Sequence, residues 1–337
     1  MSSATKISVL VTSYNLEKYI GEALESVLEQ ETSYPFEVLV GDDGSADATV
    51  AIIEEYAARY PGKLRLFRQP REAGTKYDPV RRASANRLCL LEEAKGEYCC
   101  FLDGDDHYLD RHRLQRMTDI LEKEENRDCV MCAHNLLMEW ADGSSSALCR
   151  AKKEQKLSLS DYWPLMFLQA NALLFRNIFR KDRPQGALAE LFDDNNITFW
   201  LFQHGKMYYL PECMGAYRQL EDSSWNTMSS LQHSALNMVG YNVEILVAPE
   251  CRALSDIRHY PDMKELWEKR GSYTAEQLQP FYGSAEKSGL KEALRIYRAS
   301  ELDGAEEAEL KGRIDRSRRG YRKARMRRAA RKLLGLY

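Results

Sequence analysis

The chain has 337 residues, of which 44% are hydrophobic and 29% are charged, and its net charge is −3. These values are typical of a soluble globular protein with one large domain and an appendage, or with two domains. No apolar run approaches the roughly 20 residues of a membrane-spanning helix, and Met1–Lys6 lacks the apolar stretch of a signal peptide, so a cytoplasmic protein is expected.

Strand-like and helix-like patterns alternate over the first 120 residues. Residues 7–12 form an apolar run rich in β-branched residues, which predicts a strand. Asn15 is expected to cap a helix over about 16–30, where apolar residues recur at helical spacing. The alternation continues with strands predicted over 36–40, 64–67 and 97–102, and helices over 47–59, 80–95 and around 114–121. Such βαβ units predict an α/β fold with a mostly parallel sheet flanked by helices.

The pattern changes beyond residue 128. Strands are predicted over 129–138, 170–176 and near 206–218, and helices near 160–168 and over about 195–204. Residues 228–310 are mainly helical in pattern. The predicted organisation is an α/β domain over 1–220, a helical C-terminal extension over 221–310 and a basic amphipathic tail over 311–337.

The eight cysteines are expected to be reduced thiols, because the chain shows no secretion signal. Cys129 and Cys132 have Cys-x-x-Cys spacing, but no second pair stands at the distance of a zinc site. They lie in a predicted buried strand, where cysteine acts as a small hydrophobic residue.

Polar side chains follow three of the predicted strands at the points where the strands end. They are Thr12-Ser13-Tyr14, Asp42-Asp43 and the cluster Asp103-Gly104-Asp105-Asp106. Ligands of open α/β sheets bind beyond the carboxyl ends of the strands, so the three segments should converge on one crevice. Clustered carboxylates are costly to hold together unless a cation neutralises them, and Mg²⁺ or Mn²⁺ prefers oxygen ligands.

Each segment also has a purely structural interpretation. The aspartate cluster and Asp42-Asp43-Gly44-Ser45 both suit solvated turns that cap the next helix, and Tyr14 could be a packed turn aromatic. Neither a Gly-x-Gly-x-x-Gly loop nor a Gly-x-x-x-x-Gly-Lys-Ser/Thr loop follows the first strand, which argues against the usual dinucleotide and NTPase sites. An acidic, metal-ready crevice instead suits a nucleoside diphosphate, with Tyr14 stacking on the base and Asp43 accepting from its edge.

An ordered set of motifs over about residues 6–220 resembles family 2 glycosyltransferases of the GT-A fold. The motifs are Ile7-Ser-Val-Leu-Val-Thr-Ser-Tyr-Asn15, Val40-Gly-Asp-Asp-Gly-Ser45, Lys95-Gly-Glu-Tyr98 and Phe101-Leu-Asp-Gly-Asp-Asp106. The resemblance implies inverting transfer from a nucleotide-activated sugar, commonly UDP-linked, with Mn²⁺ or Mg²⁺ on the diphosphate.

The resemblance also implies roles for individual residues. The positions that match nucleotide contacts of the family are Thr12, Tyr14, Asp43, Arg87 and Asp103, the last being the first aspartate of the Asp-x-Asp motif. Asp105 matches the second aspartate of that motif, which is usually the metal ligand, and Asp106 is an adjacent candidate. The local spacing around Arg87 leaves its match ambiguous.

The general base of an inverting member is an Asp or Glu that precedes an apolar helix ending in a Gly-containing turn. Counting back from His204-Gly205 gives Asp194 this position, with Asp193 as the fallback. A base here would deprotonate the acceptor hydroxyl. Capping the helix is the structural alternative for Asp194, and both roles can coexist.

Two departures from the family pattern stand out. Tyr217-Arg218 is followed by Gln219-Leu220, where many members have a histidine that helps to hold metal or phosphate, so no histidine is assigned. Residues 74–82 are also longer and more basic than usual. Their Lys76, Arg81 and Arg82 could contact diphosphate or an anionic sugar, or belong to a solvated loop.

The end of the chain is strongly basic. Residues 311–337 contain 12 Lys/Arg and one acidic residue, a net charge of +11, whereas residues 1–310 contain 36 Lys/Arg and 50 Asp/Glu, a net charge of −14. A basic helix with an apolar stripe can lie on an anionic membrane surface, which suits a lipid-linked acceptor. The alternatives are docking on the acidic body of the protein and a solvated tail; nucleic-acid binding lacks a supporting motif.

The sequence therefore predicts a metal-dependent inverting glycosyltransferase that extends a cell-surface glycan from the cytoplasmic side. Its partners would be a nucleotide-sugar donor and a saccharide or lipid-linked acceptor. A nucleotidyltransferase is the rival enzyme class, although the first strand lacks the Gly-rich basic loop that this class needs. A nucleotide-sugar-binding pseudoenzyme is the rival without activity.

Overall fold

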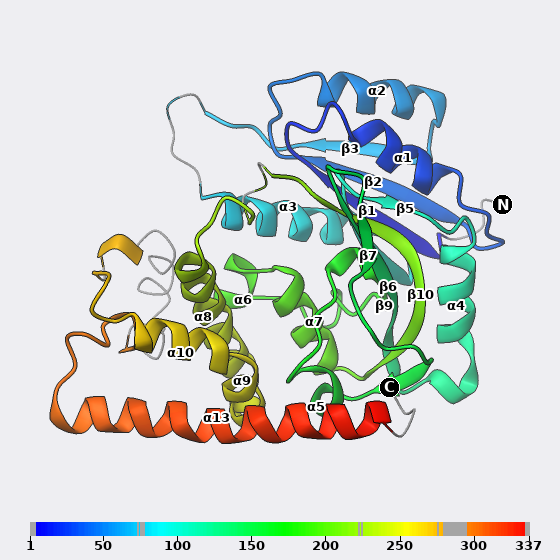
Figure 1. Ribbon diagram of the computed structural model, residues 1–337. Helices are drawn as coiled ribbons and strands as arrows, with labels where there is room; N and C mark the ends of the chain where they lie inside the picture. Colours follow the sequence, from blue (N-terminus) through cyan, green and yellow to red (C-terminus); the bar gives the residue numbers. More distant parts are fainter. Residues whose placement is uncertain are drawn as a thin grey trace. The chain divides into compact units, whose positions relative to one another are not determined.

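The computed structural model describes residues 5–333 except 73, 75–77, 222, 224, 275 and 279–294 (Figure 1). The chain forms two compact units. Residues 1–158, 168–185 and 189–219 form the first, here called the α/β unit. Residues 159–167, 186–188 and 220–337 form the second, here called the helical unit.

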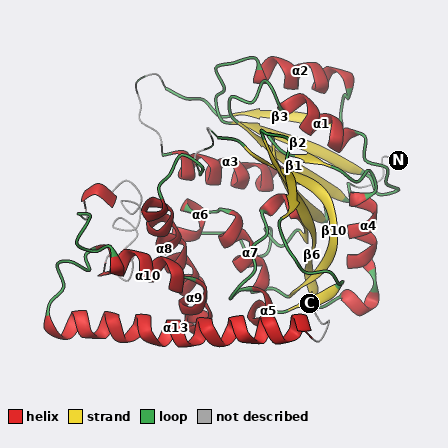
Figure 2. Ribbon diagram, viewed as in Figure 1, coloured by secondary structure: helices red, strands yellow, loops and turns green. Residues whose placement is uncertain are grey.

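A mixed sheet lies at the centre of the α/β unit, and helices flank it (Figure 2). Its strand order is β3-β2-β1-β4-β9-β6-β10-β5, with β7 paired to β6 and β8 paired to β10. The strands are β1 (Ile7–Ser13), β2 (Phe36–Asp42), β3 (Leu64–Arg68), β4 (Tyr98–Asp103), β5 (His107–Tyr108), β6 (Cys129–Trp140), β7 (Ser145–Ala147), β8 (Gln155–Leu157), β9 (Leu173–Arg176) and β10 (Lys206–Gln219). Strands β1 to β4 pair in parallel, β9 runs antiparallel to β4 and β6, and β10 is parallel to β6.

The predicted fold class, α/β with a helical C-terminal region, is confirmed, but several local predictions were wrong. Only the second half of the predicted strand 170–176 is a strand, because Ala170–Ala172 forms a 3₁₀ turn, η2. The helix expected near 160–168 is the single turn α5 (Leu159–Tyr162), since Pro164, two residues later, cannot donate a helical hydrogen bond. The short strands β5, β7 and β8 were not predicted, and two or three residues carry too little pattern to reveal a strand.

Both faces of the parallel strands are covered. Helices α1 (Ile20–Leu28), α2 (Thr49–Arg59) and α4 (Arg113–Glu122) contribute buried side chains to the apolar core on one face. On the other face, α3 (Pro79–Glu93) packs against β1 and β2, and the Phe101 ring of β4 contacts the rings of Phe175 and Phe192. Burial on two sides holds the carboxyl ends of β1, β2 and β4 in place.

Asn15 does not cap the first helix, contrary to the prediction. Helix α1 begins only at Ile20, and Asn15 adopts a left-handed conformation with φ of 54°, which asparagine tolerates better than most residues. Its Oδ1 accepts a hydrogen bond from the backbone N–H of Ala46 at 2.8 Å. Asn15 therefore ties the loop after β1 to the loop after β2.

Four helices make up most of the described part of the helical unit. They are α8 (Ser230–Val247), α9 (Arg252–Arg258), α10 (Tyr260–Glu268) and α13 (Gly304–Leu333). Helix α13 packs on α9 and α10 through a stripe that includes buried Leu310 and Ile314. Gly320 allows a close approach, because a Cβ there would lie 2.7 Å from Ile257 Cγ1. The predicted extension and basic tail thus share one helix; residues 334–337 lie outside the described residues. No helix within the described ranges is both long and apolar enough to cross a membrane.

A buried charged network lies between the helices of this unit. Glu244 is fully buried; one carboxylate oxygen lies 2.8 Å from His259 Nε2, and the other accepts from Trp163 Nε1 at 3.2 Å. Burial alone would lower the pKa of His259, but the charge of Glu244 and hydrogen bonds to Asp262 and Glu244 raise it to about 9. The imidazole is therefore charged at neutral pH.

Glu244→Gln is expected to lower the unfolding free energy by about 3 kcal/mol at pH 6.5, because it leaves a buried imidazolium without its main partner. A raised folded-state pKa gives stability that is complete below pH 6.5 and is lost as pH rises through 9. The difference between the two proteins should therefore shrink in urea titrations at pH 9.5. Glu309→Gln, which breaks an exposed pair with Arg295, should cost less than about 1 kcal/mol.

Candidate active site

The ends of β1 and β4 bring Thr12 and Asp103 together. The two residues are register partners, and Thr12 Oγ1 donates to Asp103 Oδ1 at 2.7 Å. The turn after β4 lies directly on β1, because the Gly104 N–H donates to the Thr12 carbonyl at 2.8 Å. A Cβ on Gly104 would lie 2.8 Å from that carbonyl oxygen, so only glycine fits. The aspartate cluster is therefore anchored to the end of β1.

The two aspartates after β2 have different environments. Asp42 accepts hydrogen bonds from the backbone N–H groups of Gly44 and Ser45 at 3.0 and 2.9 Å and so shapes the turn. Asp43 is buried and pairs with Arg71 and Arg82. Asp42 therefore has the turn-forming role that was the structural alternative for this segment, whereas Asp43 is held by two guanidinium groups.

Tyr14 lies at the rim of the same region with 43% of its surface exposed. The Arg71 guanidinium lies 3.8 Å from the centre of the Tyr14 ring. One face of the ring that was expected to stack on a base is therefore against Arg71, the partner of Asp43. Of the basic segment before α3, Arg82 reaches Asp43, Arg81 pairs with Glu190 at 2.9 Å, and Lys76 lies outside the described residues.

Asp106 is buried and its carboxylate is fully engaged. Its Oδ1 accepts from the Arg218 backbone N–H and its Oδ2 from Asn171 Nδ2, each at 2.8 Å. Burial and the charges of Asp105 and Asp103 raise the pKa of Asp106 well above its ordinary value. These contacts make Asp106 a link between the aspartate turn, η2 and β10.

Asp105 differs from its neighbour because, within the described part of the chain, its carboxylate is recorded as accepting only from its own backbone N–H. The backbone carbonyl of Asp105 accepts from Arg218 Nη1 at 2.7 Å. Burial and the charge of Asp103 raise the pKa of Asp105 to about 6. A carboxylate that is held by no other described residue is the one in this cluster best suited to a cation.

A divalent metal fits this arrangement only if the substrate supplies ligands. Among the described residues, no group of three His, Cys, Asp or Glu side chains is arranged to hold a metal ion. Mg²⁺ is usually bound by one or two protein carboxylates together with substrate phosphates and water. Asp105 with the diphosphate of a nucleotide sugar would be such a set.

Arg87 connects the aspartate cluster to the predicted base. Its buried guanidinium Nη2 lies 3.2 Å from Asp103 Oδ1 and 3.4 Å from Asp194 Oδ1, and Nη1 donates to the Phe192 carbonyl at 3.3 Å. Burial would lower the pKa of Arg87, but the charges of Asp103 and Asp194 outweigh it and raise the pKa. The guanidinium therefore stays charged between two carboxylates.

The capping role beside α7 (Asp194–Phe202) belongs to Asp193, which accepts from the Asn196 N–H at 2.9 Å. Asp194 is the first helical residue, and its carboxylate accepts from the Ala170 N–H at 3.2 Å. Burial raises the pKa of Asp194 to about 6, although the Arg87 charge acts to lower it. The two adjacent aspartates thus have separate structural environments.

Several site residues were not found from the sequence. Gln169 Nε2 donates to Asp103 Oδ2 at 3.3 Å, and η2 supplies Asn171 and the Ala170 N–H. Fully buried Arg113 holds η2 by donating to the carbonyls of Asn171 and Leu173 at 2.9 and 3.1 Å. The sequence offered one indication of these contacts: the amide side chains of Gln169 and Asn171 interrupt an otherwise apolar run.

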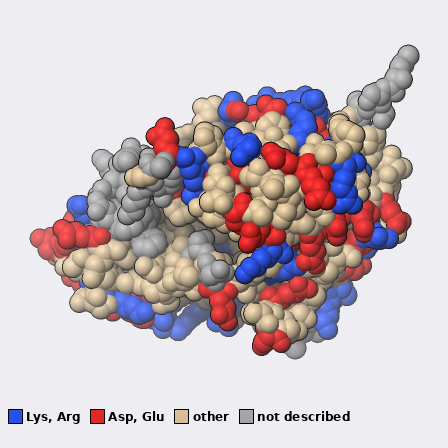
Figure 3. Space-filling view, turned by 90° about the horizontal axis from the view of Figure 1, so that it is seen from above, with Lys and Arg blue, Asp and Glu red and all other residues tan. Residues whose placement is uncertain are grey.

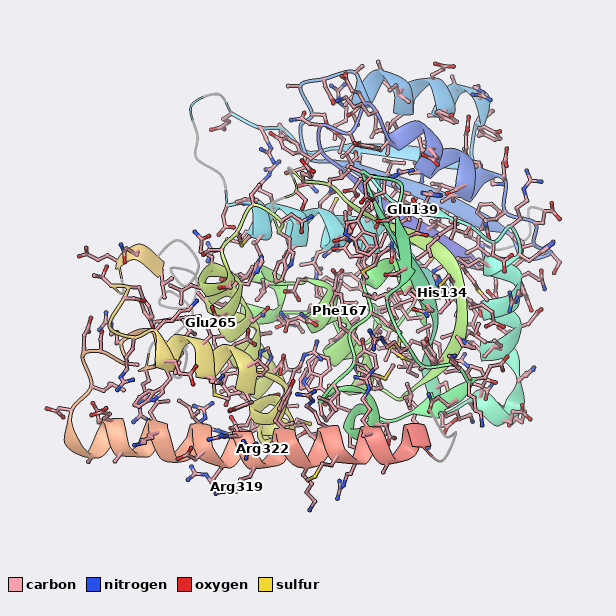
Figure 4. All side chains as sticks on the ribbon, viewed as in Figure 1. His134, Glu139, Phe167, Glu265, Arg319 and Arg322 are labelled. Atoms are coloured by element: carbon pink, nitrogen blue, oxygen red, sulfur yellow. The ribbon has the colours of Figure 1, made fainter. Side chains whose placement is uncertain are left out.

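Arg113 has no carboxylate partner among the described residues; its Nε donates to His134 Nε2 at 2.8 Å. That contact requires a neutral imidazole with its proton on Nδ1, which lies 2.6 Å from the Asn135 carbonyl oxygen (His134 is labelled in Figure 4). Burial and the Arg113 charge hold the pKa of His134 well below its ordinary value. His134 is therefore a structural support of Arg113 rather than a metal ligand.

Arg87→Met is expected to lower the unfolding free energy by about 3 kcal/mol at pH 7.5, because it leaves the half-buried carboxylates of Asp103 and Asp194 without their shared cation. The loss should be smaller at pH 5, where Asp194, whose pKa of about 6 rises further without the guanidinium, is protonated. Urea titrations at the two pH values measure this. Arg81→Met, on the same helix but in a more exposed pair with Glu190, should cost under about 1 kcal/mol at both; equal losses would contradict the assignment.

Comparisons with known proteins identify the family to which the chain belongs. The model of the family described as Glycosyl transferase family 2 matches residues 8–182. The EpsE protein of Bacillus subtilis, whose name assigns it to the glycosyltransferases, is 34% identical over 258 residues, which cover 75% of this chain and 84% of EpsE. The Rv1520 protein of Mycobacterium tuberculosis is 28% identical over 285 residues, covering 81% of this chain and 67% of that protein.

The crystal structure of residues 1–349 of Staphylococcus aureus TarS in complex with UDP-GlcNAc has a similar fold. It aligns with a TM-score of 0.60 and 18% identity over 98% of this chain and 93% of that one. At that identity the similarity concerns the fold alone.

Proposed function

The chain belongs to glycosyltransferase family 2, and from this premise we propose that it transfers a sugar, with inversion, from a nucleotide sugar to a hydroxyl group of an acceptor. Asp105 would hold a Mn²⁺ or Mg²⁺ ion on the donor diphosphate, and Asp194 would act as the general base. Thr12, Tyr14, Asp43, Arg87 and Asp103 would form the nucleotide side of the site.

One observation carries this proposal: the buried guanidinium of Arg87 joins Asp103 to Asp194 in a single network. This guanidinium lies within 3.4 Å of both carboxylates. A donor bound at the ends of β1 and β4 would therefore be separated from Asp194 by the Arg87 side chain alone. Asp194 does not cap α7, and the pKa of its carboxyl group is about 6. A general base works best with a pKa near the operating pH, which suits Asp194.

The donor is proposed to be a UDP-sugar. TarS, which has a similar fold, was crystallised with UDP-GlcNAc and with UDP. The sequence of TarS from S. aureus, named a poly(ribitol-phosphate) β-N-acetylglucosaminyltransferase, is also 33% identical over 122 residues, or 36% of this chain. Recognition of the base would require Arg71 to share the Tyr14 ring with it or to move aside.

The chemistry would be a single displacement. Asp194 would remove the proton of the acceptor hydroxyl while that oxygen attacks the anomeric carbon from the face opposite the diphosphate. The bond from the anomeric carbon to the diphosphate oxygen breaks, and its electron pair leaves with UDP. A bound divalent ion would supply Lewis-acid stabilisation of the leaving diphosphate. Arg87, held between Asp103 and Asp194, would keep Asp194 ionised and aligned.

The acceptor is proposed to be a saccharide or a lipid-linked saccharide in cell-surface polysaccharide synthesis, with the enzyme on the cytoplasmic face of the membrane. The apolar stripe of α13 is packed within the helical unit, so membrane contact would rest on charge rather than on insertion. Arg316, Arg319 and Lys323 are exposed and form no ion pair with a described residue. Each cation near an anionic surface contributes about 1 kcal/mol.

The test is release of UDP from a panel of UDP-sugars with Mn²⁺, with or without added acceptor. The proposal expects release from at least one donor and none after metal is chelated. Tight donor binding without release from any donor would favour a nucleotide-sugar-binding pseudoenzyme. Release of pyrophosphate from nucleoside triphosphates would instead favour a nucleotidyltransferase.

A further inference from the structure

A hollow of about 680 Å³ lies in the helical unit, between α10 and α13. We call it the basic groove. Its lining consists of Tyr260, Pro261, Lys264, Glu265, Glu268 and Lys269 on the α10 side and Arg318, Tyr321, Arg322 and Arg325 on the α13 side. It belongs to the helical unit alone and contains none of the residues assigned above to donor binding or catalysis.

The charges of the groove do not cancel. Lys269 pairs with Glu265 at 2.7 Å and Lys264 with Glu268 at 3.5 Å, so the α10 side is balanced. Arg318, Arg322 and Arg325 are exposed, and none of them forms an ion pair with a described residue. Three guanidinium groups therefore remain to be neutralised. On the face seen in Figure 3, by contrast, Lys and Arg are interspersed with Asp and Glu.

The three arginines lie along one side of α13, at spacings of four and three residues. Figure 4 shows Arg322 on the side of α13 toward α10 and Arg319 on the opposite side. At 1.5 Å per residue, seven residues span about 10 Å. A chain with repeated anionic groups can follow this row of guanidinium groups and pair with each of them.

The rest of the lining also suits a phosphate chain. The Tyr260 and Tyr321 rings pack with their centres 5.3 Å apart and provide a rigid wall with hydroxyl groups. Arginine matches phosphate because its planar fork donates two parallel hydrogen bonds. A flat bilayer would meet the outer side of α13 rather than a hollow lined from two helices.

We propose that the basic groove binds a linear phosphodiester chain, and that this chain is part of the acceptor. Its identity as acceptor rests on the proposed glycosyl transfer; its binding to the groove does not. The outer cations Arg316, Arg319 and Lys323 remain available for a membrane surface, so the two sets of cations on one helix have separate partners.

The test compares two triple variants of the full chain that remove the same charge from the same helix. R318Q/R322Q/R325Q removes the three α13 cations that line the groove and leaves the paired Lys264 and Lys269. R316Q/R319Q/K323Q is the matched control outside the groove; glutamine preserves helix propensity. The probe is fluorescently labelled long-chain inorganic polyphosphate, followed by anisotropy at fixed salt without donor. The groove variant should bind at least ten-fold more weakly than the unmodified protein, and the control less than three-fold. Equal weakening in both, or no binding by the unmodified protein, would overturn the proposal.

Two further measurements separate the alternatives. The control variant R316Q/R319Q/K323Q should no longer sediment with vesicles of phosphatidylglycerol and phosphatidylcholine, whereas the groove variant should still do so. The reverse result would make the groove a lipid headgroup site and overturn the proposal of a phosphodiester chain. Release of UDP by the groove variant without acceptor should equal that of the unmodified protein. Polyphosphate binding without any UDP release would refute the proposed function while leaving the groove as a phosphate-chain site.

Discussion

Asp194→Asn is expected to lower turnover of the donor by about 10³-fold, because general-base catalysis contributes 10² to 10⁴. Asparagine keeps the volume of the side chain, and its oxygen can still accept from the Ala170 N–H, so the fold should survive. The affinity for UDP should change by less than three-fold. Steady-state UDP release with saturating acceptor, together with UDP titration calorimetry, measures both quantities.

Asp193→Asn is the matched control for this substitution. Asp193 caps α7 through the Asn196 N–H, and asparagine is an equally good cap. The control should therefore retain activity within about three-fold. If both variants lost activity to the same extent, or if Asp194→Asn kept a tenth of the activity, Asp194 would not be the base.

The same assignment predicts the acid limb of the pH profile. The base must be deprotonated, and burial raises the pKa of Asp194 to about 6. Turnover should therefore rise between pH 5 and 7 with a midpoint near 6. Asp105 also has a pKa of about 6, so the profile should be recorded at saturating metal, which keeps that carboxylate ionised. Persistence of the limb in Asp194→Asn would contradict the assignment.

Asp105→Asn is also expected to have a large effect, abolishing metal-dependent turnover and weakening UDP binding in Mn²⁺ by at least 100-fold. Among the described residues the carboxylate is recorded as accepting only from its own backbone N–H, so its removal breaks no hydrogen bond to another residue. Calorimetric titration of UDP with Mn²⁺ and with EDTA measures the metal-dependent part.

The stability of the metal-free Asp105 variant provides an independent check. A carboxyl whose pKa is raised in the folded state destabilises that state at neutral pH, so the neutral asparagine should raise Tm by a few degrees. Weaker UDP binding together with a higher Tm would show that the Asp105 carboxylate serves metal and donor binding rather than stability. Loss of binding with a lower Tm would instead point to a structural role for Asp105.

The alternating strands and helices of the first 120 residues were predictable because their apolar periods are long. The convergence of the polar strand ends was predictable once these strands were placed, because the carboxyl ends of parallel strands lie at one edge of the sheet. The separate roles of neighbouring aspartates were not. Asp42 and Asp43, or Asp105 and Asp106, differ only in which distant donors reach them, such as Arg71 for Asp43 and Asn171 for Asp106.

The support of the site by η2 was also beyond the sequence pattern. The apolar run around residues 170–176 predicts a strand, but Arg113, some sixty residues earlier, captures the Asn171 and Leu173 carbonyls and turns the first three residues toward the site. Long-range hydrogen bonds of this kind override local propensity. Arg87 was a weak candidate from spacing alone, and its importance rests on contacts with two carboxylates 91 residues apart in the chain.

The central claim is a single displacement at the anomeric carbon of a nucleotide sugar. Proton NMR of donor hydrolysis by the enzyme tests it without knowledge of the acceptor, because water can replace the acceptor hydroxyl. With an α-linked UDP-sugar and Mn²⁺, the first free sugar detected before mutarotation should be the β anomer, and its formation should be lost in Asp194→Asn. The α anomer as the first product, or its formation at an unchanged rate in the variant, would contradict the account.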